Sequence, residues 1–278
     1  VAAGILNVVP NLFFVIVCHL AEAGVALASA ISQWLSAGLV LFFLRRVHDS
    51  YRLNLRGVRF HASKVRLILP LGLSAAAQNA IFATANLFIQ SGVNTFDAVI
   101  VEGTAAAANA DSLVYDVMAA IYTACSSFMS QNYGAGKRKR MLHSYLVALG
   151  YSLGIGLIFG ISLALFGRGF LRIFATDADV IEAGLVRLQL MGFCYGFSAF
   201  MDCTIAASRG LGKSIIPTII VVLGSCVFRV AWVYTIFAYF NTIMSLYLVY
   251  IFSWTLTAIA EIIYFIHIYR GIAKRLGA

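Results

Sequence analysis

Hydrophobic positions divide the chain into long apolar stretches separated by short polar segments. The stretches lie near residues 1–20, 23–44, 67–93, 98–128, 144–166, 183–207, 214–238 and 244–268. A helix of about 20 mostly apolar residues is long enough to cross the hydrocarbon core of a bilayer. The pattern therefore predicts an all-α, polytopic membrane protein with about eight spanning helices.

Composition supports a location in the lipid bilayer. Hydrophobic residues make up 62% of the 278 positions and charged residues only 11%, whereas soluble domains are about 45–50% apolar. The cysteines lie inside apolar stretches without C-x-x-C spacing, so we expect small buried thiols and neither a disulfide framework nor a metal site. They are Cys18, Cys125, Cys194, Cys203 and Cys226.

Basic residues in the polar segments predict the orientation, because Lys and Arg concentrate in cytoplasmic loops. The segments 45–66, 137–140, 209–213 and 270–275 are rich in Lys and Arg. Two spans separate each of these segments from the next, so all of them fall on the same side. We therefore expect them in the cytoplasm together with the C-terminus, and the mixed-charge segment 168–179 outside.

The stretch "SSFMSQNYGAGKRKRM" at 126–141 joins two predicted spans. A phosphate-binding loop requires G-x-x-x-x-G-K-[ST]. "NYGAGKR" has Gln131 at the first Gly and no Ser or Thr, and "SRGLGKS" has Ala207 at the first Gly. We therefore expect neither nucleotide nor nucleic-acid binding. Instead, we expect a helix end that is capped by glycine and side-chain amide groups. The capping residues would be Gln131, Asn132, Gly134 and Gly136, and the basic run KRKR at 137–140 would lie at the inner membrane surface.

The same stretch resembles the joint after the eighth helix of MATE (multidrug and toxic compound extrusion) transporters. "SRGLGKSIIPTII" at 208–220, with Arg209 and Gly210, is similar to the segment entering the eleventh helix of that family. "FRVAWVYTIF" at 228–237 and "AGVALASAISQW" at 23–34 resemble two further family segments. The resemblance covers essentially the whole chain.

The resemblance implies a fold of two six-helix bundles. Residues 1–46 would be the last two helices of the N-lobe, 47–66 the cytoplasmic interlobe loop, and 67–278 the C-lobe. Since the chain opens at Val1 directly in an apolar run, we interpret it as a fragment without the first four helices.

The resemblance also implies a secondary antiporter of the cell membrane, monomeric and without a cofactor. It would export cationic or amphipathic organic compounds in exchange for Na⁺ or H⁺, with no enzymatic activity. One alternative is a lipid-linked oligosaccharide flippase of the same superfamily, which would need several basic residues in its cavity. Arg229 is the only basic residue that we place well inside a span. A second alternative is a receptor or scaffold that transports nothing.

Polar residues recur along one face of the third predicted span. Asn79, Asn86, Gln90 and Asn94 are separated by seven, four and four positions, which places them on one helix face. Such a face either hydrogen-bonds neighbouring helices or lines a cavity. Both interpretations remain open for these residues.

Ionisable residues within spans are costly and usually face a bundle interior or a water-filled cavity. In the fourth span, Glu102, Asn109 and Asp116 share one stripe at about 100° per residue, and Asp111 lies nearly opposite with Tyr115 beside it. The small residues at 105–108 favour close helix approach and a central position for this span.

The sixth span carries Asp202 and the seventh carries Arg229. We expect Arg229 to form an ion pair with an acid of the same bundle, which would keep that acid ionised. Asp111 is therefore the favoured cation-coupling residue. The full set of coupling candidates is Asp111, Asp202, Asn109, Asp116 and Glu102. Glu261 in the last span has no motif support.

Overall fold

The computed structural model describes residues 2–47, 52–54, 57 and 59–277, which are almost entirely helical and contain no β-strand. Eight helical stretches follow one another, as the hydrophobic pattern predicts. Among the described residues, seven of these stretches are long and apolar enough to span a membrane, and the first contains only a shorter apolar helix, Asn7–Val17. The chain forms two compact units, Val1–Ala62 and Ser63–Ala278.

The first unit is a helical hairpin. Helix α1 (Ala2–Leu12) continues into the π-helical turn η1 (Phe13–Val17) and packs against α2 (Ala21–Arg46). His19 and Ala21 have positive φ angles of 51° and 42° in the turn between them. The amide of Asn7 donates to Ser32 Oγ at 3.1 Å. Polar pairing between the two helices therefore accompanies their apolar contact.

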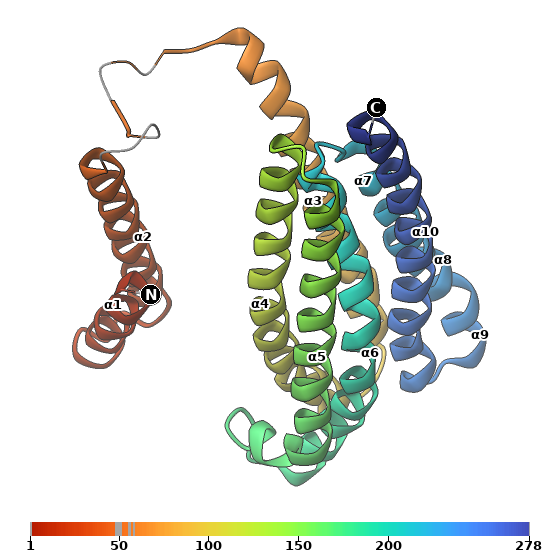
Figure 1. The fold of residues 1–278 in the computed structure, drawn as a ribbon. Coiled ribbons are helices and arrows are strands. Elements are labelled where there is room, and N and C mark those ends of the chain that lie inside the picture. Colours follow the sequence, from red (N-terminus) through yellow and green to blue (C-terminus); the bar gives the residue numbers. More distant parts are fainter. Residues whose placement is uncertain (1, 48–51, 55–56, 58, 278) are drawn as a thin grey trace. The chain divides into compact units, whose positions relative to one another are not determined.

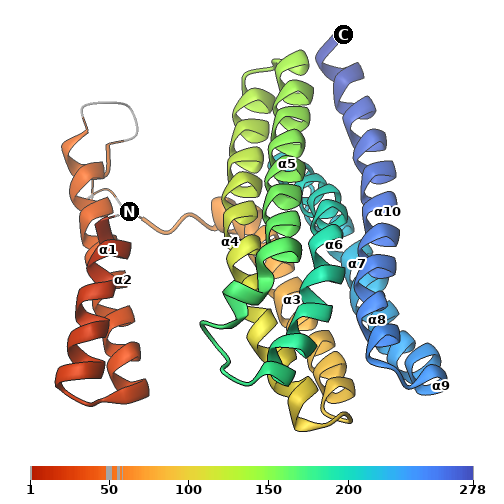
Figure 2. The same ribbon diagram turned by 90° about the horizontal axis from the view of Figure 1, so that it is seen from below.

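The second unit is a bundle of long helices joined by short connections (Figures 1 and 2). It contains α3 (Ala62–Val93), α4 (Ala98–Gly134), α5 (Arg138–Leu171), α6 (Ala178–Gly210), a continuous helical stretch at 215–240, and α10 (Ile243–Gly277). Helix α3 begins within the expected loop 47–66. Residues 48–51, 55–56 and 58 of that loop lie outside the described residues.

Helix α6 forms the centre of this bundle, in contact with α4, α5, α7 and α10. Two glycine crossings allow the helices to approach this closely. A Cβ added to Gly160 on α5 would lie 2.0 Å from the Gly192 carbonyl oxygen, and one added to Gly103 on α4 would lie 2.7 Å from the Gly184 nitrogen. The fourth span, expected in a central position, packs as α4 against both α5 and α6, but α6 is the more deeply buried of the two helices.

The helical stretch at 215–240 changes its winding several times. It consists of α7 (Ile215–Val221), η3 (Val222–Val227), α8 (Phe228–Trp232), η4 (Val233–Phe237) and α9 (Ala238–Phe240). The elements η3 and η4 are π-helical turns, a local geometry that often occurs at functional sites. Arg229 lies in the short α-helical segment between them.

The joint between α4 and α5 forms the predicted capped turn. Gly136 has a φ of 68°, and the Lys137 N–H donates to the Asn132 carbonyl at 2.9 Å. The Asn132 amide in turn donates to the Phe128 carbonyl at 2.8 Å. An added Cβ at Gly134 meets open space, so the conformational requirement for glycine falls on Gly136.

All five cysteines are free thiols. Four of them are buried as expected, but Cys18 is exposed because it lies in the turn between the hairpin helices. The described residues contain no cluster of three His, Cys, Asp or Glu side chains that would hold a metal ion.

Candidate functional site

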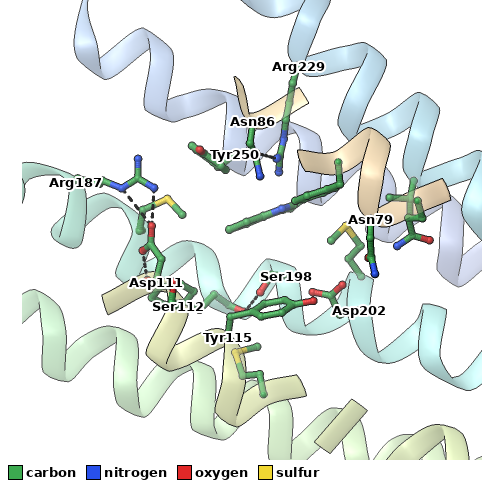
Figure 3. A pocket seen from close by; sticks show the side chains of 18 residues that line it. Asn79, Asn86, Asp111, Ser112, Tyr115, Arg187, Ser198, Asp202, Arg229 and Tyr250 are labelled. Carbon is green, nitrogen blue, oxygen red and sulfur yellow. Dashed lines mark hydrogen bonds and ion pairs between the residues drawn. The ribbon is translucent and has the colours of Figure 1, made fainter. Parts of the chain in front are cut away.

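A pocket of about 350 Å³ lies within the second unit, between side chains of α3, α4, α6, the 215–240 stretch and α10 (Figure 3). Small-molecule sites typically measure about 300–1,000 Å³ and combine apolar walls with a few polar groups. Here methionine and aromatic side chains supply the apolar wall. The lining includes these sequence-predicted residues: Asn79, Asn86, Asp111, Tyr115, Asp202 and Arg229.

Asp111 is held by two residues of the neighbouring helix α6. The Arg187 guanidinium donates to Asp111 Oδ2 from Nη2 at 2.6 Å and from Nε at 3.2 Å. The Tyr195 hydroxyl donates to the other carboxylate oxygen. The Arg187 side chain is only 8% exposed and that of Asp111 is 20% exposed. Both carboxylate oxygens of Asp111 are therefore engaged by donors from α6.

Arg229 is fully buried and lines the same pocket. Its Nη1 donates to Asn86 Oδ1 at 2.8 Å, and its Nε donates to Ser253 Oγ at 3.3 Å. Within the described part of the chain no carboxylate lies within ion-pair distance of this guanidinium. The expected Arg229 ion pair is therefore wrong, because Asn86 and Ser253 occupy its donors and Arg187 takes the acid instead.

Asp202 lines the pocket from α6 and is partly buried. Among the described residues it has no hydrogen bond and no ion pair. Figure 3 shows the Tyr115 ring beside it on the same side of the pocket. Asp202 is thus a pocket carboxylate that no donor holds, in contrast to Asp111.

Arg209 connects the end of α6 to the pocket wall. We assigned it with Gly210 to a structural joint, and Gly210 does lie at a close contact, where an added Cβ would be 2.6 Å from the Ser126 carbonyl oxygen. The Arg209 guanidinium, however, donates at 2.6 Å to Gln78, which lines the pocket from α3. Arg209 therefore has a pocket contact in addition to its place at the helix end.

The remaining polar candidates lie elsewhere. Glu102, Asn109 and Asp116 are exposed on α4 and do not line the pocket. The Gln90 amide donates to Asn94 Oδ1 at 2.9 Å on the exposed face of α3. The polar stripe of α4 and the pair Gln90 and Asn94 therefore lie outside this pocket.

The sequence did not predict two residues of the site, Arg187 and Trp254, or the burial of Glu261, which does not line the pocket. Arg187 lies near the start of the predicted sixth span, but α6 begins at Ala178, which places Arg187 well inside the helix. Trp254 lines the pocket from α10 and carries no sequence signal beyond an apolar run. Glu261 is 0% exposed, and neither of its oxygens has a hydrogen-bond partner in the described structure. A carboxylate inside an apolar span was the only signal available for it.

Comparisons with known proteins agree with this architecture. Residues 70–235, more than half of the chain, match the MatE family. A probable multidrug resistance protein NorM of Thermotoga maritima is 23% identical over 227 residues, covering 78% of this chain and 47% of that protein. An FAD transporter of Shewanella oneidensis is 29% identical over 177 residues, covering 62% of this chain and 38% of that protein.

Solved structures show the same fold. An outward-facing multidrug resistance MATE family transporter of the MOP superfamily superposes with a TM-score of 0.88 at 19% identity, covering 98% of this chain and 61% of that structure. The chain spans less than half the length of both sequence relatives. Because the family model matches more than half of its residues, the chain belongs to the MATE family.

Proposed function

We propose that the protein is a secondary antiporter that exports amphipathic organic compounds, cationic ones included, in exchange for H⁺ or Na⁺. It acts in the cell membrane with its C-terminus in the cytoplasm. The observation that carries this proposal is the unpartnered carboxylate of Asp202 in a pocket enclosed by membrane-length helices. Ionisable groups placed in this way commonly form cation pathways in transporters.

We infer different roles for the two pocket acids from the difference in their contacts. Asp111 already has a guanidinium and a hydroxyl donating to it, so a proton or Na⁺ would have to displace these donors. Asp202 has no such competitor. Of the coupling candidates, Asp202 is therefore the residue that we propose for the coupling cation, and Asp111 is a structural anchor for α6.

A second acid supports cation exchange in this part of the bundle. Glu261 on α10 is fully buried, and its oxygens have no hydrogen-bond partner among the residues that the structure describes. Arg209 and Asp202 are the charged groups near enough to act on it electrostatically. Arg209 reaches Gln78 at the pocket wall. A cation bound at Asp202 thus changes the electrostatic surroundings of Glu261 and of the Arg209 contact.

Coupling follows from linkage between two binding events. If cation binding at Asp202 favours one conformation and the exported compound binds better to the other, each ligand lowers the affinity for the other. Two opposite charges in the pocket, Asp202 and Arg229, form no ion pair with any described residue. Their sum is zero, so the pocket does not select compounds by net charge alone. The Shewanella oneidensis relative, an FAD transporter, is consistent with organic substrates beyond cations.

Transport in proteoliposomes tests the proposal. Proteoliposomes that contain the complete protein are loaded with ethidium, a cationic aromatic probe. A pH gradient and a Na⁺ gradient are then imposed in separate experiments. The unmodified protein should move ethidium under one of the two gradients, and Asp202→Asn should abolish the gradient-driven part while equilibrium binding of ethidium remains. Asp179→Asn, the same change at an exposed position of α6, is the control. Gradient-driven export at the parental rate by Asp202→Asn would refute the assignment of Asp202.

A further inference from the structure

Two buried N–H donors at the pocket have no acceptor. Arg229 Nη2 and Trp254 Nε1 are both buried, and neither has a hydrogen-bond partner among the described residues. Both residues line the same pocket, one from α8 and one from α10. Buried donors are almost always satisfied in folded proteins, so an orphaned pair at one cavity requires an explanation.

The side chains that carry these two donors lie close together. The Arg229 guanidinium carbon lies 5.9 Å from the centroid of the Trp254 ring, and it also contacts the rings of Phe82 at 4.5 Å and Tyr250 at 4.8 Å. These aromatic faces and the bonds to Asn86 and Ser253 hold the guanidinium in place. Figure 3 shows Arg229 extending toward the pocket beside Asn86 and Tyr250. The Nη2 group is therefore a preorganised donor.

Within the described part of the chain, the charge of Arg229 also lacks a counter-ion at ion-pair distance. A fully buried cation is costly unless an anion compensates it. Arg187 already neutralises Asp111. Asp202, the acid whose charge acts on Arg229, is outside ion-pair distance.

We propose that Arg229 and Trp254 form a binding site for an oxyanion, a carboxylate or phosphate carried by the exported compound. Guanidinium groups bind both anions through charge-assisted hydrogen bonds, and the indole N–H supplies a second donor to another oxygen. The surrounding aromatic rings accept the apolar body of such a compound. This inference deepens the proposed function, because it names a substrate class for the same pocket and rests on that function.

A matched set of probes isolates the anionic group. Binding of 1-naphthoate, 1-naphthyl phosphate and the neutral 1-naphthamide to the complete protein in detergent is measured by isothermal titration calorimetry. We expect at least one of the two anions to bind about ten-fold or more tighter than the amide, as for hydrogen bonds to charged groups. The preferred anion distinguishes a carboxylate from a phosphate site. Equal affinities for all three probes would show that water satisfies the donors and would overturn the proposal.

Variants then assign the donors. Trp254→Phe keeps an aromatic ring and removes the N–H, so it should reduce the preference for the anion over the amide by about ten-fold. Trp232→Phe is the matched control, because that indole already donates to the Ser245 carbonyl at 2.9 Å and lies outside the pocket. An unchanged preference in Trp254→Phe would exclude Trp254. Arg229→Lys retains the charge but not the planar group, and should weaken binding of the anion without unfolding the protein.

Failure of this proposal is separable from failure of the proposed function. If the unmodified protein exports ethidium under a gradient but does not distinguish naphthoate or naphthyl phosphate from naphthamide, the antiport proposal stands and the anion site is refuted. If no gradient drives export while anion preference depends on Trp254, the anion site stands and the antiport proposal is refuted.

Discussion

Arg187 on α6 donates to one carboxylate oxygen of Asp111 on α4 from two nitrogens, at 2.6 Å and 3.2 Å. Both side chains are largely buried, and the pair joins two neighbouring helices of the bundle. An ion pair of this kind stabilises a unique arrangement of the helices only while both partners are present. It also leaves Asp202 as the pocket carboxylate available to a cation.

Breaking the pair on one side should destabilise the protein more than removing both charges. Arg187→Gln leaves the Asp111 carboxylate without its counter-ion, and we expect a loss of about 3–5 kcal/mol, reduced by the partial exposure of Asp111 to the pocket. The double variant Asp111→Asn/Arg187→Gln should recover most of that loss. Thermal unfolding in detergent, analysed as a double-mutant cycle, measures the coupling. Simple additivity of the two single variants would contradict the account.

The crossing of α5 and α6 should tolerate no side chain at Gly160. An added Cβ would lie 2.0 Å from the Gly192 carbonyl oxygen, and because backbone cannot move aside, Gly160→Ala should cost at least about 3 kcal/mol, the upper end of overpacking. Gly154→Ala on the same helix meets open space and should be neutral or stabilising by up to about 1 kcal/mol. Equal melting temperatures for the two variants would show that the helices do not approach this closely.

The turn after α4 should depend on Gly136 and not on Gly134. Gly136 has a φ of 68°, and a residue with a side chain in this left-handed conformation costs about 1–2 kcal/mol. Gly136→Ala should therefore lower expression and the melting temperature, whereas Gly134→Ala has free space around the new Cβ and should not. A larger effect of Gly134→Ala than of Gly136→Ala would contradict the assignment of the strained position to Gly136.

Hydrophobic spacing predicted the helices well because a span in lipid must satisfy all its backbone groups internally, which leaves little besides a helix for a long apolar run. It also found Asp111, Asp202 and Arg229, because charges stand out in apolar runs. The pairing of Asp111 with Arg187 could not be predicted. It depends on how α4 and α6 are rotated about their axes, and the Gly103–Gly184 contact that determines this joins distant parts of the chain.

The winding of the 215–240 stretch was equally hidden in the sequence. Each π-helical turn changes which side chains face the bundle, so a regular helical wheel misplaces residues beyond it. Arg229 follows η3 directly. The apolar residues of this stretch carry no distinctive marker from which this change of winding could be predicted.

The orientation predicted from basic residues is tested by labelling. In a variant without its native cysteines, a cysteine at Lys139 should react with a membrane-impermeant maleimide only from the cytoplasmic side. A cysteine at Ile173, which is exposed in the turn after α5, should react only from outside. Reaction of position 139 from outside would reverse the orientation proposed for the whole bundle.

Competition between the exported compound and the coupling cation at Asp202 is the central claim. Calorimetric titration of the complete protein with ethidium, repeated across pH at constant Na⁺ and across Na⁺ concentration at constant pH, measures how many cations leave as ethidium binds. For the unmodified protein, we predict that ethidium affinity falls as one of the two cations is raised, and that Asp202→Asn removes this dependence while Asp179→Asn retains it. The same dependence in Asp202→Asn as in the unmodified protein would contradict the account.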